Sequence, residues 1–289
     1  MGFNVNIDQI QLFSSNISNR LFRRFPGSKI FAAPHLVKLI PRDVKEIVSP
    51  FIGGGGFELF LTCRDIKVHA YDKFEPLVNC WQYAQKEPKK LSKYCQKLLL
   101  SKDRDEFNRI SNGEFIKITD PFERAAYYWL LSSIGWNGTA FRGCYTYTII
   151  DNNAYSVHKD GSIGNQLTKF SILENFYNPN ITVKEADYKQ SLEEHSDLFA
   201  YCDPPYPKAG DMYGNSKEYH SEFNHEELAE YLLNRKTPWM LSYSNHPLIE
   251  ELYPKDKCIW LDQWWRQPKN VQSKSKEVVI LSKPTKGKI

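Results

Sequence analysis

The chain has 289 residues, 41% of them hydrophobic and 14% aromatic, which is enough for a substantial core in one large domain or in a domain with an inserted subdomain. Its net charge of +4 permits a polyanionic partner but is below the strongly basic level that marks many nucleic-acid-binding domains. Six scattered cysteines without a C-x-x-C pair argue against a zinc motif or a disulfide framework. No apolar run has the length of a membrane span and the N-terminus lacks a signal-peptide layout, so we expect no membrane contact and a cytoplasmic location.

Each predicted strand is a short run rich in apolar residues. The seven runs are KEIVSP (45–50), IKVHAY (66–71), ITVKEA (181–186), DLFAYC (197–202), PWMLSY (238–243), CIWLD (258–262) and EVVIL (277–281). Several are almost continuously apolar, as strands with both faces covered should be, and helical segments separate most of them. This alternation predicts an α/β fold with a seven-stranded, mostly parallel sheet. Only a loop separates the last two runs, so we expect a C-terminal antiparallel hairpin there.

The gap between the second and third predicted strands contains helices and turns. The clearest predicted helices of the chain span 75–85, 88–100, 120–136 and, after the gap, 223–236. The third of them begins with a good N-cap, Asp120, followed by Pro121. Turn signals after it separate aromatic and β-branched runs, which indicates hairpins or loops. We therefore interpret roughly residues 85–170 as an insertion in the sheet domain, with Arg124 as a solvated helix residue.

A run of four glycines, Gly53 to Gly56, lies between the first predicted strand and a helix. Glycines allow a sharp turn and let a ligand approach the backbone, and the helix N-terminus that follows offers free N–H groups to an anion. The next strand ends at Asp72, an acid at the spacing that binds ribose hydroxyls. The pattern is neither a strict G-x-G-x-x-G nor a phosphate-binding P-loop. The glycines leave open a dinucleotide, another adenosine cofactor or a plain surface loop.

The stretch YCDPPYP (201–207) follows a predicted strand directly. Pro204 and Pro205 cannot continue a central strand, since proline lacks a backbone N–H and has a fixed φ. They form a stiff turn that holds the Asp203 carboxylate, the Pro204 carbonyl and the Tyr206 ring at a strand end, where open α/β sheets bind ligands. Two rigid acceptors beside an aromatic face suit the exocyclic amino group of a planar base.

These motifs, in this order, resemble those of the Dam-like N6-adenine-specific DNA methyltransferases, over most of the chain. The matching stretches are RRFPGSK (23–29), PFIGGGG (50–56), Asp72, NGTAFRG (137–143), EADYKQSL (185–192), YCDPPYP (201–207) and LSYSN (241–245). The resemblance implies a Rossmann-like class I methyltransferase fold. It divides the chain into a catalytic domain, residues 1–84 and 171–289, and an inserted target-recognition subdomain, residues 85–170.

The resemblance also implies S-adenosyl-L-methionine as the cofactor and no metal. The implied cofactor-binding residues are Phe25, Lys29, Phe51, Gly53, Gly54, Gly55, Asp72, Lys73, Asp187, Tyr188 and Asp203. Lys29 and the glycine backbone would hold the methionine end, Asp72 the ribose, and Asp187 with Tyr188 the adenine. The implied catalytic residues are Asp203, Pro204, Pro205 and Tyr206.

Double-stranded DNA is the partner that the resemblance implies, and a cognate restriction enzyme is a candidate second partner. The target adenine would be flipped out of the duplex, and Asn137 and Arg142 in the insertion would contact DNA. The residues leave alternatives open: methylation of cytosine N4 in DNA, of RNA or of a protein amide, or, in a different class, a catalytically inactive DNA-binding protein. The oligomeric state is also left open.

Overall fold

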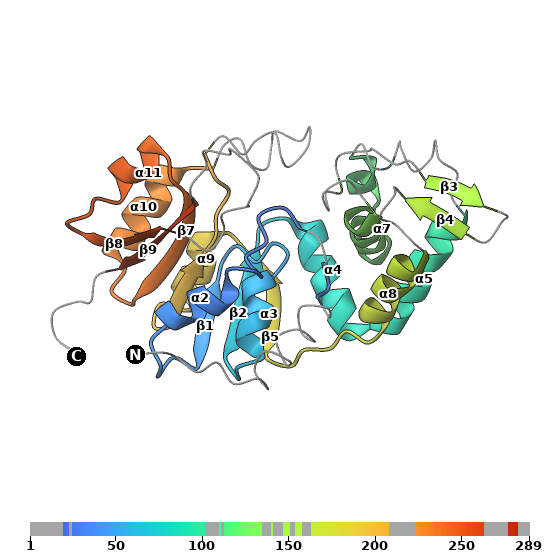
Figure 1. Ribbon diagram of the computed structural model, residues 1–289, viewed down its shortest axis with the longest axis horizontal. Helices are drawn as coiled ribbons and strands as arrows, with labels where there is room; N and C mark the ends of the chain where they lie inside the picture. The colour runs from blue at the N-terminus through green and yellow to red at the C-terminus, as the bar shows by residue number, and fades with distance from the viewer. Residues whose placement is uncertain are drawn as a thin grey trace.

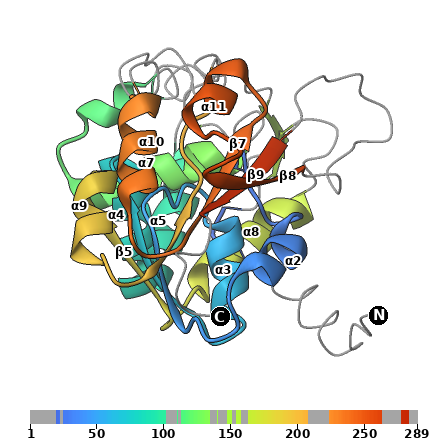
Figure 2. The same cartoon turned by 90° about the vertical axis from the view of Figure 1, so that its left-hand side faces the viewer.

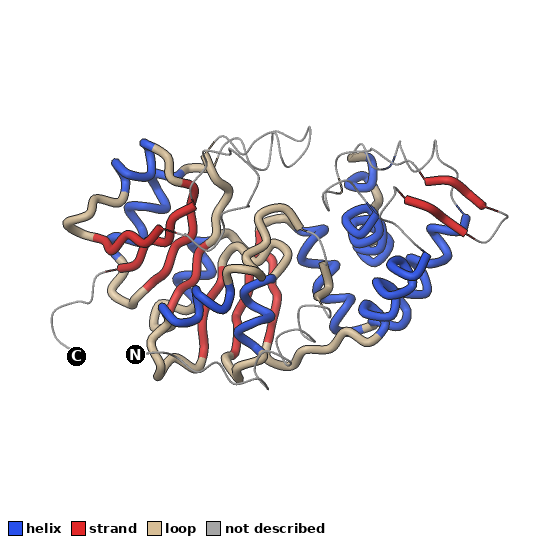
Figure 3. The backbone as a smooth tube through the Cα atoms, in the orientation of Figure 1, coloured by secondary structure: helices blue, strands red, loops and turns tan. Residues whose placement is uncertain are grey.

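A computed structural model gives the fold of the protein, and it describes part of the chain. The described residues are 20–22, 25–101, 110, 113–134, 140, 147–150, 154–157, 163–207, 223–262 and 277–282. Their main feature is a seven-stranded sheet at one side of the molecule (Figures 1 and 3). Its strands are β1 (Glu46–Ser49), β2 (Lys67–Asp72), β5 (Ile181–Glu185), β6 (Phe199–Cys202), β7 (Trp239–Ser244), β8 (Cys258–Asp262) and β9 (Glu277–Ser282).

The strand order is β5-β2-β1-β6-β7-β9-β8. The pairs β5–β2, β2–β1, β1–β6 and β6–β7 are parallel, whereas β9 runs antiparallel to both β7 and β8. All seven predicted strands and the C-terminal hairpin are thus confirmed, and so is the Rossmann-like α/β fold. The hairpin returns so that β9, the last strand among the described residues, lies between β7 and β8.

The central strands are buried on both faces, which explains their almost continuous apolar sequences. All four residues of β6 are buried, and successive residues belong to two separate cores. Ile47 and Tyr201 lie in the core on one face of the sheet, and Val48 and Cys202 in the core on the other. This alternation is the two-residue period of a pleated strand.

Helices cover both faces. On one face lie α2 (Ala33–Leu36), followed by the 3-10 turn η1 (Val37–Leu39), then α3 (Gly56–Thr62) and α4 (Glu75–Lys86). On the other lie α9 (Tyr188–Glu194), α10 (His225–Asn234) and α11 (Pro247–Leu252). In Figure 2, α9 and α10 lie on the opposite side of the molecule from α2 and α3. Asn224 caps α10, and its side chain accepts a hydrogen bond from Glu227 N at 3.0 Å. No helix among the described residues is long and apolar enough to cross a membrane.

The segment interpreted as an insertion forms a second group of elements at the other side of Figure 1. Its elements are α5 (Pro88–Ser101), η2 (Glu114–Lys117), α7 (Pro121–Ile134), β3 (Tyr147–Ile150), β4 (Ala154–Val157) and α8 (Ile163–Glu174). The predicted helices and a hairpin are present, and β3 pairs antiparallel with β4. The expectation of hairpins or loops is wrong from Ile163 onward, where α8 begins. Buried Phe170 and Leu173 form one face of α8, and this i, i+3 pair was the missed signal.

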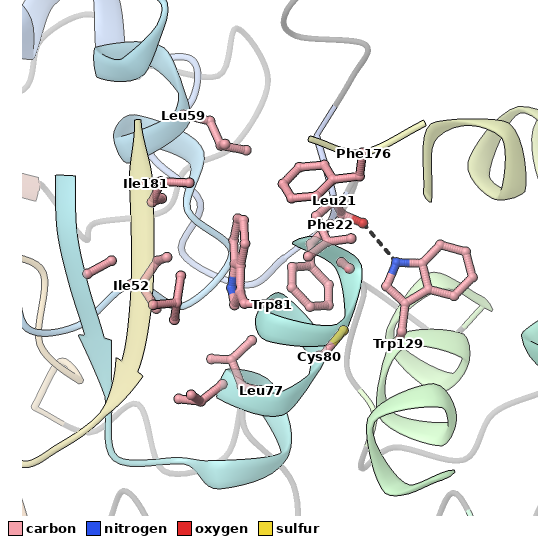
Figure 4. Close-up of a cluster of buried hydrophobic side chains, with 14 of the residues drawn as sticks. Leu21, Phe22, Ile52, Leu59, Leu77, Cys80, Trp81, Trp129, Phe176 and Ile181 are labelled. Carbon is pink, nitrogen blue, oxygen red and sulfur yellow. Dashed lines mark hydrogen bonds between the residues drawn. The ribbon is translucent and has the colours of Figure 1, made fainter. Parts of the chain in front are cut away.

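The two groups share one hydrophobic core, which passes through α4 and α7 (Figure 4). Trp81 on α4 is fully buried, and Trp129 on α7 donates from Nε1 to the carbonyl of Leu21 at 3.1 Å. The expectation that Arg124 is a solvated helix residue is wrong. Arg124 is partly buried and pairs with Glu75, so it joins α7 to α4.

Candidate active site

The candidate site lies at the carboxyl ends of β1, β2 and β6. Parallel strands end at the same edge, and β1 has β2 on one side and β6 on the other. From β1 the chain continues to β2 and β5 in one direction along the sheet, and β6 and β7 lie in the opposite direction. The position between β1 and β6 is therefore a topological switch point, where open α/β sheets bind ligands.

The glycine turn connects β1 to α3 and packs against the protein itself. Gly53 and Gly55 have left-handed backbones, with φ of 47° and 63°, and Gly55 is the N-cap of α3. A Cβ on Gly54 would lie 2.5 Å from the Cβ of Phe25, and one on Gly55 would lie 2.6 Å from the Trp81 ring. The lack of a side chain on these glycines therefore leaves room for Phe25 and Trp81. From the sequence, this room was expected to serve only the approach of a ligand to the backbone. Residues 25–30 and the glycine turn, separated by more than 20 positions in the sequence, therefore pack together as one unit.

Asp72, the last residue of β2, lies directly against this turn. Its Oδ2 accepts from Gly53 N at 3.1 Å and its Oδ1 from Phe74 N at 3.0 Å. Burial raises the pKa of the Asp72 carboxyl to about 6, against the opposing effect of the N–H groups of Phe74, Gly53 and Lys73. The side chain of Lys73 is exposed. The backbone thus fixes the Asp72 carboxylate beside the turn, and each oxygen keeps a lone pair for a hydroxyl donor.

Lys29 and the turn after β6 come together, although 174 positions separate Lys29 from Asp203. The Lys29 ammonium lies 2.8 Å from Asp203 Oδ2, and only 3% of the Lys29 side chain is exposed. The Tyr206 hydroxyl donates to Asp203 Oδ1 at 3.3 Å, and the Lys29 Nζ lies 5.0 Å from the centre of the Tyr206 ring. Pro204 is buried and Pro205 partly buried. This arrangement gives a carboxylate oriented from two sides, next to a rigid carbonyl and an aromatic ring.

Aromatic side chains line the adjoining part of the site. Phe51 stacks on Tyr188 with ring centres 5.8 Å apart, and Phe223 contacts both rings. The Tyr188 hydroxyl donates to Glu227 at 2.9 Å. Asp187, by contrast, acts as the N-cap of α9, where its side chain accepts from Lys189 N at 3.0 Å. One of its oxygens is therefore already engaged in helix capping.

Two polar groups near the site were missed by the sequence analysis. Glu58 is buried in α3 and accepts a hydrogen bond from Ser49 Oγ at 2.7 Å. On the other face of the sheet, His225 pairs with the buried Tyr243 hydroxyl. The available signal for Glu58 was a single acid inside the apolar run FELFL. A run of this kind is buried in the core, and an acid buried there needs a partner.

The predicted DNA-contacting residues Asn137 and Arg142 lie outside the described residues.

The stretch LSYSN falls at the end of β7, where buried Ser242 pairs with the Tyr201 hydroxyl at 3.2 Å. That pair connects β7 to β6 immediately before Asp203. Within the described ranges, no group of three His, Cys, Asp or Glu side chains is arranged to hold a metal ion.

A glycine turn, an acid after the second strand and an Asp-Pro-Pro-Tyr turn at the switch point define a Rossmann-like methyltransferase. The family model for the D12 class of N6 adenine-specific DNA methyltransferases matches residues 25–267. The chain belongs to this family, and it is an adenine-specific DNA methyltransferase.

Two curated relatives agree with this assignment. The chain is 28% identical over 264 residues to the type II methyltransferase M1.LlaDCHI of Lactococcus lactis subsp. cremoris, an alignment that covers 84% of this chain and 87% of the relative. It is 21% identical over 199 residues to the DNA adenine methylase of Haemophilus influenzae, which covers 68% of this chain and 67% of that protein. Both alignments extend well beyond the short catalytic motif.

Proposed function

We propose that the protein transfers a methyl group from S-adenosyl-L-methionine to N6 of an adenine that is flipped out of double-stranded DNA. The observation that carries the proposal is the position of two units at neighbouring strand ends. The glycine turn with Asp72 follows β1 and β2, and Asp203 with its two prolines follows β6. A methyl donor on the first unit would therefore lie next to a base on the second.

The residues of the first unit fit an adenosine-containing cofactor. The Asp72 carboxylate, held by Gly53 N and Phe74 N, accepts hydrogen bonds from the ribose hydroxyls. The aromatic rings of Phe51 and Tyr188 contact the adenine, with Asp187 at its edge. The Lys29 ammonium, which pairs with Asp203, attracts the methionine carboxylate.

The residues of the second unit fit an exocyclic amino group. The N6 amino group has two hydrogens, and the Asp203 carboxylate and the Pro204 carbonyl accept one each. Pro204 and Pro205 keep both acceptors rigid, while the Tyr206 ring stacks on the base. Inside a duplex the amino group is paired and stacked, so the base must leave the helix to reach these acceptors.

The cofactor supplies an electrophilic methyl group when it is bound: the N6–carbon bond forms as the sulfur–carbon bond breaks, and one N6 proton is released to solvent. The chain contributes by aiming acceptors at N6, whose lone pair is otherwise delocalised into the ring. Positive charge develops on N6 in the transition state, and the Asp203 carboxylate stabilises it there. The six cysteines need no role in this mechanism.

We further propose that residues 85–170 form the target-recognition subdomain, in which Asn137 and Arg142 contact DNA. An arginine that makes two hydrogen bonds to one guanine favours that base over the other bases by about 1–3 kcal/mol. If Arg142 makes such a contact, Arg142→Ala should raise methylation of near-cognate sites relative to the cognate site. If Arg142 touches only phosphate, activity falls equally on all sequences and becomes less dependent on salt. The name of the Lactococcus relative as a type II methyltransferase supports a cognate restriction enzyme as a partner.

The test is incubation of the purified protein with methyl-labelled S-adenosyl-L-methionine and double-stranded DNA, followed by digestion and identification of the modified nucleoside. We expect N6-methyladenine. Parallel reactions with RNA and protein test the alternative substrates, and recovery of N4-methylcytosine or of no labelled nucleoside from DNA contradicts the proposal. Replacement of the target adenine by 2-aminopurine tests base flipping, because its fluorescence rises when the base leaves the stack.

A further inference from the structure

A buried carboxyl group, that of Glu58, lies next to the proposed catalytic turn without taking part in the mechanism above. Glu58 belongs to α3, and only 3% of it is exposed. Its Oε1 accepts from the hydroxyl of Ser49, the last residue of β1, which is fully buried. β1 pairs directly with β6, the strand that leads to Asp203. The Glu58 carboxyl therefore lies beneath the switch point, within the protein.

The groups around Glu58 form a small buried charge cluster. The segment that carries Lys29 packs against the first turn of α3, since a Cβ on Gly56 would lie 2.6 Å from Ser28 Oγ and 3.0 Å from Ile30 N. Among the described residues, Lys29, Asp203 and the Tyr201 phenol are the charged or titratable groups coupled electrostatically to Glu58. Lys29 is paired with Asp203 at 2.8 Å and is itself almost fully buried. Tyr201 is hydrogen-bonded to Ser242. Two carboxyl groups and one ammonium are thus grouped together, and Glu58 and Lys29 are almost fully buried, where charges interact more strongly than in bulk solvent.

We propose that Glu58 is a positioning residue whose ionisation divides the attraction of Lys29 between two carboxylates and so makes Asp203 a stronger acceptor for the N6 amino group. This inference rests on the proposed function. When Glu58 is neutral, the Lys29 charge acts mainly on Asp203 and weakens it as an acceptor. When Glu58 is ionised, a second negative charge offsets Lys29, and the positive charge that develops on N6 meets a more negative environment.

The ionisation of Glu58 falls near neutral pH. Burial raises the pKa of Glu58 to about 7, and the hydrogen bond from Ser49 opposes this increase. Asp203 raises the pKa of Glu58 further and Lys29 lowers it, which are the electrostatic couplings that the proposal requires. The methyl-transfer rate should therefore rise as the pH passes through the ionisation of Glu58.

The decisive variant is Glu58→Gln, which keeps the shape of the side chain and an oxygen that accepts from Ser49 but cannot ionise. Single-turnover methylation is measured from pH 5.5 to 8.5 with labelled S-adenosyl-L-methionine and cognate DNA, so that product release does not limit the rate. We expect equal rates for wild type and variant at low pH and a wild-type rate about tenfold higher at high pH. Taking the ratio of the two rates cancels the other groups that titrate in this range.

Glu193→Gln, an exposed change of the same kind on α9, is the matched control and should follow the wild-type profile. Ser49→Ala removes the hydrogen bond but not the charge, so it should keep the pH-dependent rise. Melting curves give a readout independent of activity. The folded-state pKa of Glu58 is raised from 4.5 to about 7, so wild-type protein loses a contribution to its stability as the pH rises between these values, and the variant lacks that particular loss. The melting temperature of Glu58→Gln minus that of wild type should thus increase with pH.

A constant ratio of the two rates at all pH values, whether or not it is 1, overturns the proposal, because a purely structural role of Glu58 has no pH dependence. So does a melting difference that does not change with pH. Wild-type protein that yields no N6-methyladenine contradicts the proposed function instead. The failure of each idea is therefore recognised separately.

Discussion

Asp72 ends β2 and Asp203 follows β6 at the same edge of the sheet, but their carboxylates are held by different kinds of group. Asp72 is held by backbone N–H groups of Gly53 and Phe74, which are fixed by the turn itself. Among the described residues, the side chains of Lys29 and Tyr206 hold Asp203. Backbone donors cannot leave without unfolding the turn, whereas side chains can exchange partners. The first arrangement suits binding, and the second suits a group whose interactions change during a reaction.

The largest expected effect is on the methylation rate, and it should occur at Asp203 but not at Asp72. Asp203→Asn should lower the single-turnover methylation rate by about 10²–10³, because it removes the charged acceptor aimed at N6. Rates at saturating cofactor and DNA measure this, and a melting curve checks that the variant is folded. Asp65→Asn, an exposed turn residue with a φ of 58° that asparagine tolerates, is the control and should leave the rate unchanged. A rate for Asp203→Asn within threefold of wild type contradicts the catalytic role.

Gly54→Ala tests whether the glycine turn that holds Asp72 depends on its close packing against Phe25. The new Cβ would lie 2.5 Å from the Cβ of Phe25, so the N-terminal motif must move away from the turn. We expect a loss of about 1–3 kcal/mol in the free energy of unfolding, measured by denaturant titration, and weaker cofactor binding. Gly113→Ala is the comparison: its φ of 99° disfavours alanine, but no atom lies within 4 Å of the added Cβ. Unchanged cofactor affinity in Gly54→Ala would mean that the turn and Phe25 do not act as one unit.

A smaller effect is expected at Asp72. Asp72→Asn retains one acceptor oxygen but loses the charge, so calorimetry should show S-adenosyl-L-methionine binding about tenfold more weakly. The pKa of Asp72 is about 6, so wild-type affinity should rise as the carboxyl ionises through that pH, and the variant should lack this rise. The methylation rate at saturating cofactor should change little, in contrast to Asp203→Asn. Equal affinities in wild type and variant at pH 8 would remove Asp72 from the cofactor site.

The smallest expected effect concerns the second donor to Asp203. Tyr206→Phe removes a hydroxyl that lies 3.3 Å from Asp203 Oδ1, a long hydrogen bond, but keeps the ring. The rate should fall by less than about tenfold, since one neutral hydrogen bond contributes modestly. Tyr206→Ala also removes the stacking surface and should lose more. If both variants behave alike, the hydroxyl rather than the ring is the important part of Tyr206.

The strands and most helices could be predicted because their signals are local. The apolar runs, the Asn224 cap and the position of the prolines after Cys202 each depend on residues close together in the chain. Helix α8 was missed because its pattern is short and follows a turn-rich stretch. Arg124 was misinterpreted because its partner Glu75 belongs to another helix, 49 positions away.

The sequence by itself determined the seven strands, the glycine turn, the stiff Asp-Pro-Pro-Tyr turn and, through their order, the family. These features depend on backbone geometry and on spacing, which neighbouring residues set. Only the tertiary structure decided which groups hold each carboxylate: Lys29 reaches Asp203 across 174 positions, and Phe25 packs on Gly54. It also decided that Glu58 is buried beside Ser49. The physical reason is that burial and charge pairing arise when distant segments pack together, and no local pattern records which partner a buried charge will meet.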